Sequence, residues 1–337
     1  MKEFRNLGRT GIKVSNLCLG CMNFGGKTDA DHAARVVDRF LDEGLNFIDT
    51  ANVYHRGVSE DYLGRALSAN GKRDRVVLAT KVHAPMADDD PNMMGNTRRH
   101  IVQQCEASLK RLQTDWIDLY QIHRPQSSIP IDETLRALDD LIRSGKVRYI
   151  GTSTFAGWQI VESLWVSKEL GLNRFVCEQP PYNLMDRRIE REVIPAARTF
   201  GIALIPWSPL AGGFLTGKYK RGEAPPEGAR LQDTDSGRGK RLFSDAGFDV
   251  LETAETLASQ KGCTVSQLAL AWCAAQPGVT SPIIGPRNVE QLDDNLGALD
   301  VEITEADNEA IDRVSLPGGY VAPYFEADFG PHDHRPW

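Results

Sequence analysis

Four polar residues of types that can move a proton stand at the ends of short apolar runs, or directly after them. They are Asp49, Tyr54, Lys81 and His123, in the segments 46–49, 51–54, 76–81 and 119–123. A tyrosine is a weak acid with a pKa near about 10, and a neighbouring ammonium favours its phenolate and makes the phenol more acidic. Lys81 could supply that charge, and Asp49 could hold the lysine charged and in place. His123 could donate a hydrogen bond to a carbonyl oxygen. Brought together, these four side chains could protonate a carbonyl group while it is reduced.

The elements that would bring them together are buried strands, which can carry apolar side chains and deliver one reactive group where they end. Strand-like runs alternate with helical patterns along most of the chain. Strands are expected at 14–20, 46–49, 76–80, 117–122, 147–151, 175–178, 203–207 and 280–285. Helices are expected at 31–43, 59–68, 97–112, 131–144, 158–170, 188–200 and 289–299. Repeated βα units imply parallel strands joined by right-handed crossovers.

Eight such units could form a closed (β/α)8 TIM barrel or an open doubly wound sheet. No G-x-G-x-x-G follows a strand, which argues against a dinucleotide-binding doubly wound sheet. Reactive residues also follow the second, third and fourth strands, and a barrel builds its active site from several strand ends. The sequence therefore predicts one barrel domain over residues 1–337.

Several stretches depart from the repeat. Met1–Thr10 is expected to form a short hairpin over the barrel floor. Gly217–Gly247 is rich in Gly, Pro and charge and reads as a long loop after strand seven, a length typical of lids and binding loops. Helices at 250–259 and 265–275 precede the last strand, and 304–314 adds a helix after the barrel. Residues 316–337 are expected to be a tail near the barrel mouth.

Composition excludes some classes of function. The 337 residues carry a formal net charge of −7 and no long basic block, which argues against a nucleic-acid surface. The amino terminus lacks the apolar core of a signal peptide, and no run approaches the roughly 18 apolar residues of a membrane span. We expect a cytoplasmic protein that binds neither nucleic acid nor membrane. No feature of the sequence indicates its oligomeric state.

Three local motifs resemble sites but are better explained otherwise. Cys18 and Cys21 form a C-x-x-C, yet no second pair completes a metal set, so we expect ordinary reduced thiols and no metal site. The segment 20–28 resembles a P-loop, but Gly20 lies one residue too far from Gly26 for the phosphate-cradling register. His332 and His334 could bind a metal, but we expect an unstructured tail there.

The segment 44–54, followed by Glu60 and Gly64, resembles the signature of the aldo-keto reductase family. Lys81 and His123 match that family's other two catalytic positions, and the similarity extends over residues 7–296. The resemblance implies a (β/α)8 barrel that reversibly reduces aldehydes or ketones to alcohols with a nicotinamide cofactor, an oxidoreductase acting on CH–OH donors. It also implies that Tyr54 is the general acid, assisted by Lys81, Asp49 and His123.

The resemblance also assigns a cofactor site. Ser153 matches a residue that contacts the nicotinamide amide, whereas Thr154 replaces the family's usual asparagine. Gln179 matches another amide-binding position. Trp207 stands where many members place a stacking tyrosine, a change similar to the branch that contains bacterial general stress reductases and potassium-channel β subunits; a core aromatic is the alternative. The remaining predicted cofactor residues are Ser208, Pro209, Leu210, Gly212 and Lys218 at the pyrophosphate, and Gly285, Arg287, Gln291, Asp294 and Asn295 beyond it.

Arg287 precedes a helix after the last strand, where barrels often hold phosphate. Its fork of donors suits a 2′-phosphate and therefore favours NADPH/NADP over NADH, unless Arg287 is simply a surface arginine near a helix start.

Three functions compete. The first is an NADPH-dependent reductase of small aldehydes or ketones. The second is a regulatory subunit that keeps the pocket as a cofactor sensor, with slow or vestigial turnover. The third is a different barrel enzyme, a metal-dependent hydrolase or isomerase, for which only His123 fits the expected metal-ligand pattern. Phe24, His55, Trp158 and residues 320–329 are candidates to shape a substrate pocket.

Overall fold

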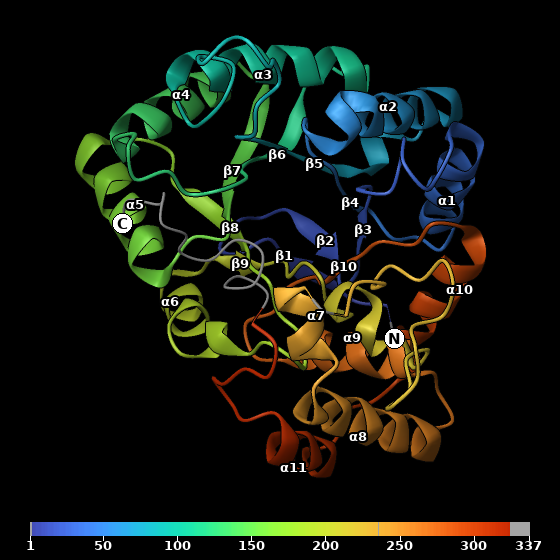
Figure 1. Cartoon of the computed structure of the whole chain (residues 1–337). Coiled ribbons are helices and arrows are strands. Elements are labelled where there is room, and N and C mark those ends of the chain that lie inside the picture. Colours follow the sequence, from blue (N-terminus) through green and yellow to red (C-terminus); the bar gives the residue numbers. More distant parts are fainter. Residues whose placement is uncertain (1, 235, 324–337) are drawn as a thin grey trace.

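A computed structural model describes residues 2–234 and 236–323 of the chain (Figure 1). Within them, parallel strands form one sheet in the order β10-β3-β4-β5-β6-β7-β8-β9. Their bounds are β3 Cys18–Gly20, β4 Phe47–Asp49, β5 Val77–Val82, β6 Ile117–Ile122, β7 Val147–Ser153, β8 Phe175–Gln179, β9 Ala203–Leu204 and β10 Ile283–Ile284.

The sheet closes on itself between its first and last strands. The backbone N–H of Thr280 donates to the carbonyl of Leu204 at 2.7 Å, and that of Ile283 donates to Pro206 at 2.8 Å. β10 pairs in turn with β3 through Ile283 and Cys18. These bonds leave no open edge, and they confirm the predicted (β/α)8 barrel.

Helices surround the strands (Figure 1). Those that follow barrel strands are α1 Ala30–Asp42, α2 Val58–Asn70, α3 Arg98–Leu112, α4 Ile131–Arg143, α5 Gly157–Leu170, α6 Val193–Phe200 and α10 Val289–Leu296. The added helices are α7 Gly237–Leu242, α8 Asp245–Lys261, α9 Val265–Ala275 and α11 Glu305–Val314. The side chains of Asp29, Thr97 and Asn288 cap the free N–H groups at the starts of α1, α3 and α10, which explains why the helices begin there.

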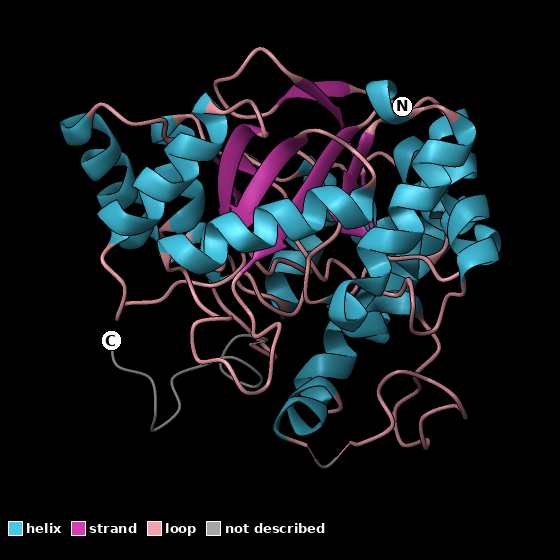
Figure 2. Cartoon of the chain, turned by 90° about the horizontal axis from the view of Figure 1, so that it is seen from above, coloured by secondary structure: helices cyan, strands magenta, loops and turns pink. Residues whose placement is uncertain are grey.

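A hairpin of β1 Phe4–Asn6 and β2 Lys13–Ser15 lies across one end of the barrel (Figure 2). The N–H of Arg9 donates to the carbonyl of Gly201, just before β9, so this is the amino-terminal end of the strands. The predicted hairpin is therefore confirmed, but its second strand takes residues assigned to the first barrel strand. Of the expected strand 14–20, only Cys18–Gly20 is a barrel strand, because the chain turns after Ser15, where Asn46 Oδ1 accepts the Ser15 N–H at 2.8 Å.

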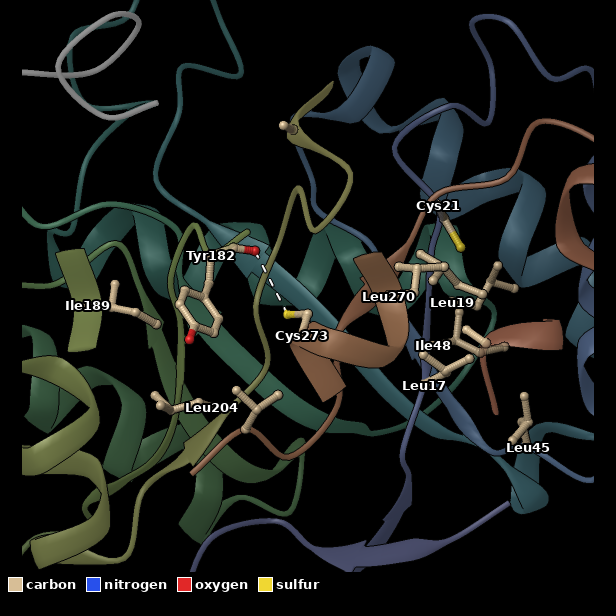
Figure 3. Packing of buried hydrophobic residues seen from close by; sticks show 14 of the residues in the cluster. Leu17, Leu19, Cys21, Leu45, Ile48, Tyr182, Ile189, Leu204, Leu270 and Cys273 are labelled. Carbon is tan, nitrogen blue, oxygen red and sulfur yellow. Dashed lines mark hydrogen bonds between the residues drawn. The ribbon is translucent and has the colours of Figure 1, made fainter. Parts of the chain in front are cut away.

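The core has two layers, which follow from the alternation of side chains along each strand. One set of strand residues lies inside the barrel, among them Cys18, Phe47, Ala79, Leu119 and Cys177. The other set packs outward against the helices. Figure 3 shows part of this outer layer, where Leu17, Leu19 and Ile48 gather beside Leu270 of α9.

The long segment after β9 is more structured than expected. A tight turn at Ala211–Thr216 follows the strand, and Gly237–Leu242 forms α7 within the stretch expected to be a loop. The first part of the predicted tail pairs with the loop after β8, since the N–H groups of Val321 and Ala322 both donate to the carbonyl of Met185. The histidines at 332 and 334 lie outside the described residues.

Candidate functional site

Three of the site residues stand on the inner face of the strands, each two positions after an interior core residue. Asp49 follows Phe47 in β4, and Lys81 follows Ala79 in β5. Gln179 follows Cys177 in β8 in the same way. Since side chains alternate along a strand, these groups point into the barrel at its carboxyl end. The strand pattern alone thus brings distant residues to one place.

Lys81 lies at the centre of the four predicted catalytic residues. Its Nζ donates to Asp49 Oδ2 at 2.5 Å, to the carbonyl of Thr50 at 2.8 Å and to the hydroxyl of Tyr54 at 3.2 Å. The Lys81 side chain is completely buried and that of Asp49 is 3% exposed. Every donor of the ammonium group therefore has a partner, which a buried charge requires.

The Asp49 carboxylate is held from its other side as well. Gln121 Nε2 and Gln179 Nε2 each donate to Asp49 Oδ1 at 3.0 Å. Burial opposes the charge of Lys81, but the Asp49 carboxylate and the Tyr54 hydroxyl outweigh it and raise the pKa of Lys81 above its ordinary value. Lys81 is therefore a fixed, permanently charged group beside the phenol.

Tyr54 is presented by a strained turn. His55 and Arg56 directly after it have φ of 49° and 54°, in the left-handed region that side chains other than glycine rarely adopt. The Tyr54 N–H donates to Ala51, and the N–H of Asn52 donates to Lys81 on the neighbouring strand. The surrounding bonds thus enforce a costly backbone that aims the phenol at Lys81, as is common at functional sites.

His123 stands across from Tyr54, with ring centroids 5.8 Å apart in an edge-to-face arrangement. Burial, together with the charges of Lys81 and Arg124, lowers the pKa of His123 well below its ordinary value. The imidazole is therefore neutral, and it can donate a hydrogen bond to a substrate oxygen without adding a charge.

These groups open into a cavity of about 640 Å³ at the barrel mouth. Asp49, Tyr54 and His123 line it, while Lys81 lies behind them. Every residue predicted to bind the cofactor also lines it: Ser153, Gln179, Trp207, Ser208, Pro209, Leu210, Gly212, Lys218, Gly285, Arg287, Gln291, Asp294 and Asn295. A volume of this size suits a medium-sized ligand.

The cavity wall after β9 is built from unusual backbone. Ser208 has a φ of 57°, and Gly212 and Gly213 have φ of 71° and 96°. Asn183 Nδ2 holds the Ser208 carbonyl at 3.0 Å, and Ser208 Oγ accepts the Gly212 N–H at 3.0 Å. Glycine suits position 213 because side chains rarely adopt a φ of 96°, whereas an added Cβ would make only an ordinary contact with Lys218 Nζ at 3.6 Å.

The far end of the cavity gathers positive charge. Partial burial lowers the pKa of Lys218, and neighbouring cations lower it further, although its side chain stays exposed. Those cations are Arg287, Lys27 and Arg230. Within residues 2–234 and 236–323, none of the four forms an ion pair with a carboxylate. Like charges gathered without counter-charges fit the phosphates of a dinucleotide.

The walls around Arg287 are tied together by loops from both ends of the sequence. Asn23 Nδ2 donates to the carbonyl of Gly285 at 2.9 Å, and Thr28 Oγ1 donates to that of Arg287 at 3.0 Å. The segment that resembled a P-loop is therefore a wall of this cavity. The Arg287 N–H donates to Gln291 Oε1, so the predicted residues at the start of α10 support one another.

Some lining residues were missed from the sequence, notably Met22, Asn23, Arg124 and Arg230. Asn23 lies in a turn after β3, and Arg230 in the long segment after β9, whose path cannot be read from local patterns. Arg124 follows His123 directly, so its place at the cavity could have been predicted from that neighbour.

Three residues suggested to shape a substrate pocket, Phe24, His55 and Trp158, do not line this cavity. Phe24 is completely buried, His55 packs on Gly26, and Trp158 is 54% exposed on α5. Trp158 is therefore exposed on its helix and Phe24 is buried under its loop, away from the cavity wall, while residues 324–329 of the predicted pocket lie outside the described residues.

The cysteines are free thiols. Burial raises the pKa values of Cys18 and Cys21, which makes reactive thiolates unfavourable there. No helix in the described part of the chain is long and apolar enough to cross a membrane.

Sequence comparisons agree with this geometry. The model of the aldo/keto reductase family matches residues 16–316. An uncharacterized oxidoreductase of Bacillus subtilis, YrpG, is 43% identical over 311 residues, which cover 89% of this chain and 92% of YrpG. A rice protein named a probable voltage-gated potassium channel subunit beta is 37% identical over 315 residues, which cover 93% of this chain and 95% of the rice protein. A protein of the same name from Arabidopsis thaliana is 37% identical over 302 residues, which cover 89% of this chain and 92% of the Arabidopsis protein. A family match over most of the barrel, with its signature at the strand ends described above, means that this chain belongs to the aldo/keto reductase family.

Proposed function

We propose that this protein reduces aldehydes or ketones to alcohols with NADPH, and that Tyr54 donates the proton. The observation that carries the proposal is the buried Lys81, whose ammonium joins the Asp49 carboxylate to the Tyr54 hydroxyl at the wall of the cavity. A fixed cation 3.2 Å from a phenol stabilises the phenolate that remains after the proton has been transferred.

NADPH, when bound, supplies the hydride; the residues of this chain supply the remainder of the reaction. His123, neutral because of its lowered pKa, donates a hydrogen bond to the substrate oxygen and orients it. Tyr54 gives its proton to that oxygen as negative charge develops there. Asp49 takes no part in proton transfer; it keeps Lys81 in its charged form and fixed position.

The choice of NADPH over NADH rests on the cations at the far end of the cavity. Ser153 and Gln179 could hold the nicotinamide amide and Trp207 could stack on the ring, which leaves the phosphates toward Ser208, Gly212 and Lys218. Arg287 could then pair with a 2′-phosphate through two donors at once. A 2′-phosphate would relieve the repulsion that lowers the pKa of Lys218.

The test is a comparison of kcat/KM for NADPH and NADH oxidation with an activated aromatic aldehyde as substrate. We expect turnover with both and at least a tenfold preference for NADPH. Turnover with neither cofactor, across aromatic and aliphatic aldehydes and ketones, would refute the reductase proposal. Equal turnover would refute the cofactor preference alone.

A second function is favoured by the relatives named as potassium channel β subunits. In that case the same cavity would serve as a sensor, and cofactor occupancy rather than turnover would be the output. Tight NADPH binding with turnover slower than cofactor exchange would support the sensor, whereas rapid multiple turnover supports the reductase.

A further inference from the structure

Thr154, the residue that replaces the family's usual asparagine, has a strained backbone. Its φ is 64°, and the side chain is 8% exposed. A left-handed conformation is tolerated by asparagine but is a genuine outlier for a β-branched residue. The structure around Thr154 must therefore hold this conformation, and Thr154 directly follows Ser153 at the cavity wall.

The Thr154 hydroxyl is held by the guanidinium of Arg124, and it also lies 3.2 Å from the Ser153 hydroxyl. Arg124 Nη1 donates to Thr154 Oγ1 at 2.7 Å and also to the carbonyl of His123 at 2.8 Å. One nitrogen thus joins the end of β6 to the end of β7. The backbone of the turn is fixed on its other side by Gln179, whose carbonyl accepts the Thr154 N–H at 3.2 Å and the Ser153 hydroxyl at 2.8 Å.

The guanidinium also reaches the third wall of the cavity. The Arg124 carbon Cζ lies 5.7 Å from the centroid of the Trp207 ring. His123, Arg124, Ser153 and Trp207 all line the same cavity. Arg124 therefore contacts the three segments that carry the predicted oxygen donor, the predicted amide contact and the predicted stacking surface.

A buried carboxyl completes the support from behind. Glu178 Oε1 accepts the N–H of Phe155 at 3.2 Å, and Oε2 accepts the Thr152 hydroxyl at 2.5 Å. Burial raises the pKa of Glu178 to about 8, while the charge of Arg124 acts in the opposite direction. The turn 152–155 is thus bonded to β8 on one side and to Arg124 on the other.

We propose that Arg124 is a positioning residue for the nicotinamide: through Thr154 Oγ1 it holds the strained turn that presents Ser153, and it fixes that turn relative to His123 and Trp207. This inference rests on the proposed function, since it concerns how the same site holds its cofactor. Lysine should not replace Arg124 fully, because an ammonium lacks the planar guanidinium that lies 5.7 Å from the centroid of the Trp207 ring. The adenosine end of the cavity, near Arg287, is formed by other loops and should be unaffected.

The test separates the two ends of the cofactor with two probes. Dissociation constants are measured for NADPH and for adenosine 2′,5′-bisphosphate, which lacks the nicotinamide. The variants are Arg124→Met, Arg124→Lys and Thr154→Val, with Thr154→Ser as the matched control that keeps the hydroxyl. Thermal unfolding of each variant confirms that it is folded.

We expect Arg124→Met, Arg124→Lys and Thr154→Val each to weaken NADPH binding about tenfold and to leave bisphosphate binding within about twofold, an effect the size of one charge-assisted hydrogen bond. Thr154→Ser should bind both probes like the wild type. The double variant Arg124→Met/Thr154→Val should lose less affinity than the two single losses combined, because both changes remove the bond between Arg124 and Thr154; Thr154→Val also removes the contact between Thr154 Oγ1 and Ser153 Oγ.

Unchanged NADPH binding in Arg124→Met and Thr154→Val, or a parallel loss of both probes, would overturn the inference. Full rescue by Arg124→Lys would overturn the requirement for the planar guanidinium. A wild-type protein that binds neither probe would instead refute the proposed function, and this is seen before any variant is measured.

Discussion

The two ends of the cavity differ in whether their charged side chains have counter-charges. At the barrel axis, Lys81 and Asp49 are buried and each has partners on every side. At the far end, Lys218 and Arg287 lie among like charges, and no carboxylate of the described residues pairs with them. The charges at the first end are balanced without a ligand, so this end is preorganised. The charges at the second end are balanced only when an anion binds.

This difference follows from what positions each end. Asp49 and Lys81 stand on strands, whose pairing sets their spacing, whereas the four cations come from loops. A reactive centre needs geometry fixed before the substrate arrives. A phosphate site gains its affinity from charge that nothing else in the protein neutralises. Stability should therefore depend on the first end and cofactor affinity on the second.

The largest effect is expected at the buried pair. Lys81→Met leaves the Asp49 carboxylate buried without its counter-charge, which should cost about 3–5 kcal/mol of unfolding free energy and abolish turnover. Adding Asp49→Asn should restore most of the stability, since no buried charge then remains, but not the activity. Chemical denaturation and turnover measured on the same samples separate the two. If Lys81→Met alone were as stable as the wild type, Lys81 would not be the required counter-charge of the buried Asp49.

The opposite result is expected at the far end. Arg287→Met should weaken NADPH binding by about 1.5–3 kcal/mol, or about 10–100-fold, and change NADH binding little, because only NADPH carries the 2′-phosphate. Lys218→Met should weaken both. Neither change should lower the stability of the free protein, since each removes a repelled charge. Lys168→Met, on α5, is the control for charge alone, and a loss of stability in the two cavity variants would argue against a ligand site.

A buried group without a counter-charge offers a smaller test through pH. Burial lowers the pKa of His100 from 6.5 to about 4. As the pH falls, His100 is therefore protonated in the unfolded chain at a higher pH than in the folded protein. Stability should therefore fall as pH drops below 6.5, by about 2 kcal/mol at about pH 5. His100→Gln should remove that part of the slope, and His55→Gln, at an exposed site, should not. Equal slopes in all three proteins would contradict the assignment.

The barrel, and the meeting of the four predicted catalytic residues at one end of it, could be predicted because both depend on local patterns. Each apolar run ends in a polar residue whose position along the strand decides which face it occupies. Asp49, Lys81 and His123 could therefore be assigned to one site from sequence alone. The strand break after Ser15 could not be predicted, since it depends on Asn46, which is distant in sequence and accepts the Ser15 N–H.

The same limit applies to the cavity walls. Arg124 was missed although it follows His123, because its importance comes from a bond to Thr154 on the next strand. Arg230 and Lys27 were missed as members of a charge cluster, because loops far apart in the sequence bring them toward Lys218. The period of two along a strand predicts which face each side chain occupies. The path of a loop depends instead on contacts that the local sequence does not specify.

The central claim is that this protein is an NADPH-dependent reductase with Tyr54 as its acid. The most direct measurement is kcat for NADPH oxidation with an aromatic aldehyde, together with the NADPH dissociation constant, in wild type and Tyr54→Phe. We predict a loss in kcat of about 10²–10⁴-fold in the variant, the contribution of a positioned acid, with NADPH binding within about twofold of the wild type. A variant that turns over as fast as the wild type would contradict that role for Tyr54.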